Sequence, residues 1–255
     1  MQSLRRPSSR LAVVVGSIVI FLFFFNGYQQ EGPSRSKFRK LPGGVEDLTP
    51  EAVPAKEQRN VLKEISGNRH VQEWAHYWQR CVPGFTLEGM EDIGDAQIEG
   101  EAVSALQVEE DQKGPGKMFY TSSPSGKRQV NPYWGRLLFR KEGDAWQPYI
   151  ELQCGALLYD KAAKNAKTVL QCSMNEGIDD AVWQNNDEIV LLGYESVTRQ
   201  MSVECESVES CAAPAIWFVD LAKGWVHSYR GGLIKHGACK LGDYLKQRLP
   251  KFFTP

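Results

Sequence analysis

Net charge of either sign is nearly missing from this chain, and histidine is scarce. The 30 Lys and Arg residues are balanced by 31 Asp and Glu residues, and only 4 His occur among 255 residues. In the part of the sequence that has the composition of a folded domain, basic residues do not alternate with aromatic residues to form the surface that nucleic acids require. The sequence therefore predicts no nucleic-acid partner.

The motifs of the common catalytic families are also missing. The sequence has no G-x-S-x-G nucleophile turn, no H-E-x-x-H zinc helix, no G-x-x-x-x-G-K-[ST] phosphate loop and no D-x-D metal motif. His236 and Cys239 form an H-x-x-C pair, but two ligands do not define a zinc site. Nine acidic side chains lie in residues 88–112 without the order of a calcium-binding loop, which favours a solvated loop. We predict no catalytic residue, no cofactor and no metal ion.

Long hydrophobic runs are absent with one exception, residues 11–25, which follow three arginines in residues 1–10. A basic segment before such a run is the pattern of a secretory signal or a signal anchor. Fifteen helical residues span about 22 Å against a hydrocarbon core of about 30 Å, and Tyr28 would extend the span into the interface. Small residues of a cleavage site do not follow the run. This favours an uncleaved anchor over residues 11–28, with a cleaved signal as the alternative.

No cysteine occurs in the first 80 residues, and 6 follow. An even number downstream of an export signal is typical of an oxidising compartment. Six cysteines allow up to 15 full pairings. The short separation favours Cys205 with Cys211, Cys154 and Cys172 could bridge neighbouring strands, and Cys81 with Cys239 would then remain. Alternatively, some of these residues are small buried hydrophobic side chains with free thiols.

Composition divides the chain into a basic N-terminus (1–10), a membrane anchor or signal (11–28), a flexible stalk rich in Pro, Gly and Ser (29–56) and one mainly β domain (57–255). Basic residues lie on both sides of the span, so loop charge leaves the orientation open. All of the cysteines follow the span. We therefore predict a single-pass membrane protein whose C-terminal domain is periplasmic, luminal or extracellular.

The domain is predicted to begin and end with helices. Val71, Trp74, Ala75 and Trp78 recur at helical spacing, so residues 57–80 are expected to be helical with a break at 67–68 and to pack these side chains in the core. Apolar runs bounded by turn residues predict seven strands, at 136–140, 149–152, 168–172, 188–192, 201–205, 216–220 and 225–229. A closing helix is predicted at 241–249. The fold class is mainly β, an antiparallel meander or propeller-like sheet with short flanking helices after an N-terminal transmembrane helix.

A faint internal repeat relates two parts of this β region. The turn at 123–128 (SPSGKR) is followed 60 residues later by the turn at 183–188 (WQNNDE), and 157–160 (LLYD) aligns at the same offset with 217–220 (WFVD). Residues 119–231 resemble TolB-type β-propeller blade repeats, in which S-P-D-G-K forms a turn and an Asp–Gly turn closes the blade. The resemblance covers about two blades, whereas a closed propeller has at least about four. It implies propeller-like sheet, with chance similarity among β-meanders as the alternative.

Aromatic residues crowd the β region, and those beside turns are candidates for a binding surface. Tyr133, Trp134 and Trp225 stand next to Gly residues or turns, where partly exposed rings give contact area at low entropic cost. We predict a membrane-tethered, non-catalytic binding or accessory domain for a protein or polymer partner, with the membrane itself contacted through residues 11–28.

The competing hypothesis is a membrane-anchored hydrolase or transferase whose site is assembled from carboxylates. Asp160, Asp179, Asp180 and Asp220 are the candidates, and the adjacent pair Asp179–Asp180 is the strongest element among them. Successive residues of a regular strand point to opposite faces, which counts against this pair.

Overall fold

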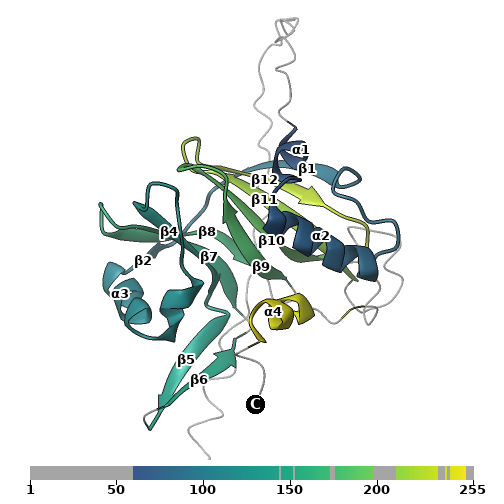
Figure 1. Ribbon diagram of the computed structural model, residues 1–255. Helices are drawn as coiled ribbons and strands as arrows, with labels where there is room; N and C mark the ends of the chain where they lie inside the picture. The colour runs from purple at the N-terminus through teal and green to yellow at the C-terminus, as the bar shows by residue number, and fades with distance from the viewer. Residues whose placement is uncertain are drawn as a thin grey trace, which may run out of the picture. The chain divides into compact units, whose positions relative to one another are not determined.

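The computed structural model describes residues 60–143, 145–151, 153–172, 176–197, 211–234, 239 and 242–250. By its internal contacts the chain divides into two units, Met1–Lys56 and Glu57–Pro255, and all of the described residues belong to the second. Two antiparallel five-stranded sheets make up most of that unit, together with a separate two-stranded hairpin (Figure 1). The architecture is therefore mainly β with few short helices, which confirms the coarse fold class that the sequence predicts.

The first sheet has the strand order β1-β12-β11-β10-β9, with every neighbouring pair antiparallel. Its strands are β1 (Glu91–Gln97), β9 (Gly177–Trp183), β10 (Glu188–Val197), β11 (Cys211–Asp220) and β12 (Trp225–Arg230). Strands β9 to β12 follow one another in sequence and in space, and β1 joins the meander at the edge beside β12.

The second sheet has the order β2-β8-β7-β4-β3 and is also antiparallel throughout. Its strands are β2 (Ala102–Val103), β3 (Thr121–Ser122), β4 (Arg128–Trp134), β7 (Cys154–Asp160) and β8 (Asn165–Cys172). The hairpin of β5 (Leu137–Glu142) and β6 (Ala145–Ile150) is inserted between β4 and β7 and extends away from the sheet (Figure 1).

The elements pack in four layers, helix, sheet, sheet and helix. Apolar side chains of both sheets, among them Val130 and Leu191, form the core between them. Helices α1 (Val61–Ile65) and α2 (Arg69–Cys81) cover the other face of the first sheet, as Figure 1 shows for α2.

On the far side, the second sheet is covered by α3 (Ala105–Lys113), which packs its Val108 against Leu157. The short 3₁₀ helix η1 (Pro115–Phe119) follows it. Helix α4 (Asp243–Arg248) packs its Leu245 with Phe119 and Tyr133. These apolar contacts hold α4 beside the end of β4.

Helix α2 forms where the apolar stripe predicts it. Asn68 caps its N-terminus by accepting a hydrogen bond from the backbone N–H of His70, which separates α2 from α1 as expected. Trp74 is 0% exposed and Trp78 1%, and both lie in the core against the first sheet. Complete burial of an aromatic side chain of this size contributes about 3 kcal/mol, so the stripe fixes α2 to the sheet.

The two sheets each contain a meander of four strands with the same connections, and the two meanders are related by the 60-residue offset seen in the sequence. Strands β3, β4, β7 and β8 form one meander and β9 to β12 form the other. Asp160 closes the β7–β8 turn by accepting from the backbone N–H of Ala162, and Asp220 closes the β11–β12 turn by accepting from that of Lys223. The left-handed position of the turn is Lys164 (φ 49°) in one sheet and Gly224 (φ 72°) in the other.

Several elements differ from the sequence-based expectation. Residues 88–112, predicted as a solvated loop, contain β1, β2 and most of α3, although the side chains of β1 are mostly exposed. Strands β4, β7 and β9 were not predicted either. Of these, β7 and β9 are buried on both faces, so their sequences show no alternation of polar and apolar residues. The predicted strand 201–205 lies outside the described residues.

One disulfide joins residues that are far apart in the sequence, and a second joins two consecutive strands. Cys81 at the end of α2 is bonded to Cys239, and Cys154 on β7 is bonded to Cys172 on β8. Both are pairs that the sequence suggests, and disulfides are typical of an oxidising compartment. The Cys205 side chain and the Cys211 side chain lie outside the described part of the chain.

The predicted anchor (11–28) and stalk (29–56) also lie outside the described residues. Within those that are described, no helix is long and apolar enough to cross a membrane.

Candidate functional site

Polar groups gather in two places, a buried cluster on β9 and an open cleft beside α3. The buried polar cluster is built around Asp179 and Asp180, which are 1% and 7% exposed. The register of β9 against β10 shifts here, because Leu192 pairs with Asp180 while the next residue, Gly193, pairs with Ile178. Asp179 is therefore the extra residue of a β-bulge.

The bulge aims both carboxylates at the same helix. Asp180 contacts His70, and the electrostatic environment of Asp179 includes the indole N–H of Trp74; these two residues are one turn apart on α2. The expectation that the adjacent pair points to opposite faces is therefore wrong, because it assumed a regular strand. A side chain at Gly193 would meet the carbonyl oxygen of Gly177 at 2.0 Å, so the bulge requires glycine there.

Asp179 is an unusual carboxylate, because no donor in the described residues makes a well-formed hydrogen bond with either of its side-chain oxygens. Burial raises the pKa of Asp179 to about 7, while the guanidinium of Arg136 and the indole of Trp74 oppose the rise. Burial therefore makes the charged form of this side chain costly.

Asp180 is instead fully paired. Its Oδ2 lies 2.9 Å from Nδ1 of His70 and 3.0 Å from Nη2 of Arg248, which extends from α4. The hydrogen bond to Asp180 raises the pKa of His70, with burial opposing the rise. Nδ1 of His70 also lies 2.6 Å from Nη2 of Arg248, so this nitrogen donates to the carboxylate when protonated and accepts from the guanidinium when not. The cluster thus ties α2, β9 and α4 together.

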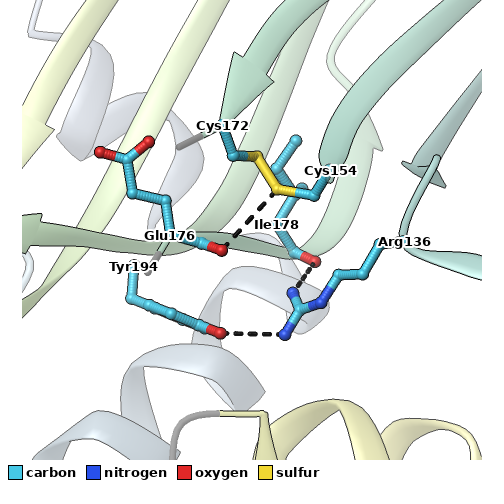
Figure 2. The surroundings of a disulfide bond; sticks show 6 residues. All are labelled: Arg136, Cys154, Cys172, Glu176, Ile178 and Tyr194. Atoms are coloured by element: carbon cyan, nitrogen blue, oxygen red, sulfur yellow. Dashed lines mark hydrogen bonds between the residues drawn. A yellow bond between two sulfur atoms is a disulfide. The ribbon is translucent and has the colours of Figure 1, made fainter. Parts of the chain in front are cut away.

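Arg136, in the turn between β4 and β5, completes the cluster beside the Cys154–Cys172 disulfide (Figure 2). Its guanidinium donates to the carbonyl oxygen of Ile178 at 3.3 Å and to the hydroxyl of Tyr194 at 2.9 Å, as Figure 2 shows. Arg136 is 9% exposed. With its charge facing Asp179, it supplies the cation that a buried acidic pair needs.

Both carboxylates of this cluster are buried, whereas the side chain of His70 is 43% exposed. The other two acidic candidates lie elsewhere. Asp160, at the β7–β8 turn, pairs with Arg128, and Asp220, at the β11–β12 turn, pairs with Lys223. The four carboxylates of the enzyme hypothesis are therefore not brought together into one site. The chemistry that this arrangement supports is electrostatic locking of α2 and α4 onto β9.

The second place is an open cleft of about 610 Å³ between α3 and the β5–β6 hairpin. We call it the α3 cleft; it is lined by Gln107, Asp111, Trp134, Gly135, Leu138, Glu151 and Gln153. Gly135 has φ +75°, and it turns the chain from β4 toward the hairpin.

The three aromatic binding candidates are separated by the structure. Trp134 is half-buried and lines the α3 cleft. Tyr133, its neighbour on β4, is 6% exposed and points into the protein, where its hydroxyl donates to the carbonyl oxygen of Asp179. Trp225 is 43% exposed but lies on β12 in the other sheet. Only Trp134 of the three therefore contributes to the cleft.

Asp111 is the most perturbed group of the α3 cleft. Its Oδ2 is buried and without a hydrogen-bond partner in the described structure. Burial raises the pKa of Asp111, and the nearby hydroxyl of Tyr120 opposes the rise. A Cβ at Gly116 would lie 2.2 Å from the Asp111 carboxylate, so this glycine makes room for it. Asp111 was not predicted as a site residue, because the acidic stretch at 88–112 was expected to be a loop. Glu151 was not predicted either, because it lies in a predicted strand at 149–152 that carries no motif.

A metal centre finds no support in the described residues, where no group of three or more His, Cys, Asp and Glu side chains could hold an ion. His227 lies between Asp92 and Asp95 of β1, at 3.0 Å and 2.6 Å, and is a partly buried residue of β12. His236 lies outside the described residues.

Comparison with known proteins adds no relative. No family model, no curated protein and no solved structure matches this chain, so the likeness of residues 119–231 to TolB-type repeats extends only to a β-rich architecture.

Proposed function

We propose that this chain is a membrane-tethered, extracytoplasmic binding domain that holds a protein or polymer partner in the α3 cleft and catalyses no reaction. The observation that carries the proposal is the cleft itself: Trp134 provides an aromatic wall beside two carboxylates and two carboxamides. A concave surface with an aromatic side and a few polar groups is the usual form of a recognition site.

The sequence supports the proposed tether, and the disulfides support the proposed compartment. Residues 11–28 have the composition of an uncleaved anchor, and 29–56 that of a stalk that would hold the domain away from the bilayer. The bonds Cys81–Cys239 and Cys154–Cys172 suit an oxidising compartment. The two meanders, with their matching turns, are propeller-like sheets that serve as the scaffold for the inserted β5–β6 hairpin.

One observation supports the competing enzyme hypothesis, and another counts against it. The β9 bulge brings Asp179, Asp180 and His70 to the same side, as an acid–base site would need. Both carboxylates are buried, however, and Asp180 is neutralised by Arg248. A catalytic acid or base must reach the proton that it transfers, so the cluster favours a structural role.

Site-specific photo-crosslinking in cells tests the proposal. A photoreactive amino acid replaces Leu106 or Ile150, which are exposed and next in sequence to Gln107 and Glu151 of the cleft lining. The matched control position is Lys161, which is exposed in the β7–β8 turn of the second sheet. A binding domain gives an adduct at the two cleft positions and none at Lys161, discrete for a protein and heterogeneous for a polymer. No adduct at the cleft, or equal adducts at all three positions, refutes the proposal.

A further inference from the structure

We infer that the α3 cleft takes a protein segment in which a lysine or arginine side chain is flanked by apolar ones, with the cation on the floor of the cleft and the apolar neighbours on its rim. The inference rests on the proposed binding function and names the class of its partner. Three features of the cleft carry it: charge, an aromatic wall and an exposed apolar rim.

The first feature is the charge of the cleft lining. Asp111 and Glu151 are its ionisable side chains, and Lys, Arg and His are all absent from the lining. Since the lining offers these carboxylates no cation, a ligand that carries one would pair with them through a charge-assisted hydrogen bond.

The second feature is the indole of Trp134 beside these carboxylates. The face of an indole ring attracts ammonium and guanidinium groups, more strongly when the site is partly shielded from water. Gln107 and Gln153 add carboxamide oxygens, which accept hydrogen bonds from the remaining N–H groups of such a cation. A carboxylate-bearing ligand would be repelled by the same lining.

The third feature is the exposure of large apolar side chains on the elements that frame the cleft or adjoin them, which we call the apolar rim. In the described residues six of them are strongly exposed, and four belong to the elements that frame the cleft or adjoin them: Leu106 of α3, Met118 of η1, and Trp146 and Ile150 of β6. Trp146 reaches the end of α3, where a Cβ on Gly114 would lie 3.4 Å from its ring.

Large apolar side chains that stay exposed on neighbouring elements favour a surface that buries against a protein. A neutral sugar chain would use the face of Trp134 and the polar groups, but it would leave the aliphatic rim uncovered. The rim therefore favours a protein segment over a glycan.

Calorimetric titration of the full-length chain in zwitterionic detergent micelles tests the inference, with the heats of empty micelles subtracted. The probes are the capped tripeptides Leu-Arg-Leu and Leu-Glu-Leu, and maltoheptaose as a neutral sugar. We expect the arginine probe to bind at least tenfold more tightly than the glutamate probe. Raising the salt concentration should weaken it, because the charges are partly exposed.

Variants locate the binding. Asp111→Asn and Glu151→Gln should each weaken the arginine probe by about threefold or more, a typical effect of losing one partly exposed charge pair. Glu91→Gln, on exposed β1 of the other sheet, is the matched control and should have no effect. Trp134→Leu should weaken binding, whereas Trp225→Leu should not.

Each other outcome overturns the inference in a distinguishable way. Equal binding of the two tripeptides, or arginine binding that survives both charge variants, refutes the cationic floor. Binding of maltoheptaose alone replaces the protein partner with a glycan and leaves the proposed binding function standing. If neither tripeptide binds while cleft adducts still form in cells, the partner has another chemistry; if the adducts are missing as well, the proposed function fails. Since Glu151 is exposed, its variant remains informative even where Asp111→Asn impairs folding.

Discussion

The substitution Asp179→Asn is expected to destabilise the folded chain at acidic pH and to stabilise it at alkaline pH. Burial raises the pKa of Asp179 from its ordinary value of 3.8 to about 7 in the folded chain. The native state therefore keeps a proton over an interval in which the unfolded chain has already lost it. The free energy of unfolding is highest at acidic pH, falls as the pH rises from 3.8 to about 7, and stays low above that.

The magnitude follows from the size of this interval. A difference of about three pH units, at about 1.4 kcal/mol each, gives about 4 kcal/mol of destabilisation by the charged carboxylate. Asparagine removes this cost but buries an amide donor with no acceptor, which costs about 1–3 kcal/mol. Asp179→Asn should therefore be less stable than the natural chain by about 1–3 kcal/mol at pH 4, and more stable by a similar amount at pH 8.

Urea denaturation of the full-length chain, followed by tryptophan fluorescence with the disulfides intact, measures the difference at each pH. Trp74 lies beside the substituted side chain and reports its unfolding directly. Asp160→Asn is the matched control: the pKa of Asp160 is lowered, first by the backbone N–H of Ala163, so its contribution is lost only below pH 4. A difference for Asp179→Asn that is flat from pH 4 to pH 8 would refute the idea that this carboxylate is protonated in the folded state.

Three further predictions concern local features of the fold. His70→Gln should destabilise the chain at pH 5 to 6 and have little effect at pH 9, because a raised histidine pKa stabilises the fold below 6.5 and this contribution is lost as the pH rises through the folded value; urea titrations at both pH values check this. Lys164→Gly should raise the free energy of unfolding by up to about 1 kcal/mol, because it removes the strain of a non-glycine residue in the left-handed region. The reverse change Gly224→Lys should lower the free energy of unfolding by about 1 kcal/mol. Equal effects of the two substitutions would contradict the explanation. Replacing Cys154 and Cys172 together with Ala should lower the free energy of unfolding by about 3 kcal/mol, as expected for a short closed loop, and alkylation without reductant followed by peptide mapping should recover the two joined in the natural chain.

Local features of the fold could be predicted, and features that depend on two segments could not. The stripe of α2 and the cap at Asn68 are readable because helical periodicity and capping involve residues within one or two turns. Strands β7 and β9 were missed because both of their faces are buried, so no period of two is left in the sequence. In β9 the two aspartates also give a buried strand the composition of a loop.

The candidate site was found only in part for the same reason. Trp134 stands beside a turn glycine, which is a local signal, and it does line the cleft. The neighbouring Tyr133 has the same sequence context but is covered by Phe119 and Leu245, whose approach no pattern in residues 128–135 encodes. Asp111 and Glu151 come from separate elements that meet only after α3 and the hairpin have packed.

The sequence by itself determined the apolar run at 11–25, the helix stripe and the turns at Asp160 and Asp220, because each depends on residue type and short separations. It suggested the two observed disulfides among several possible pairings, and the structure selects them. The tertiary structure alone decided that Asp179 and Asp180 face the same helix and that the aromatic and acidic side chains of the α3 cleft converge. A one-residue bulge is visible only in the register of two paired strands, and a cleft only in the packing of elements distant along the chain.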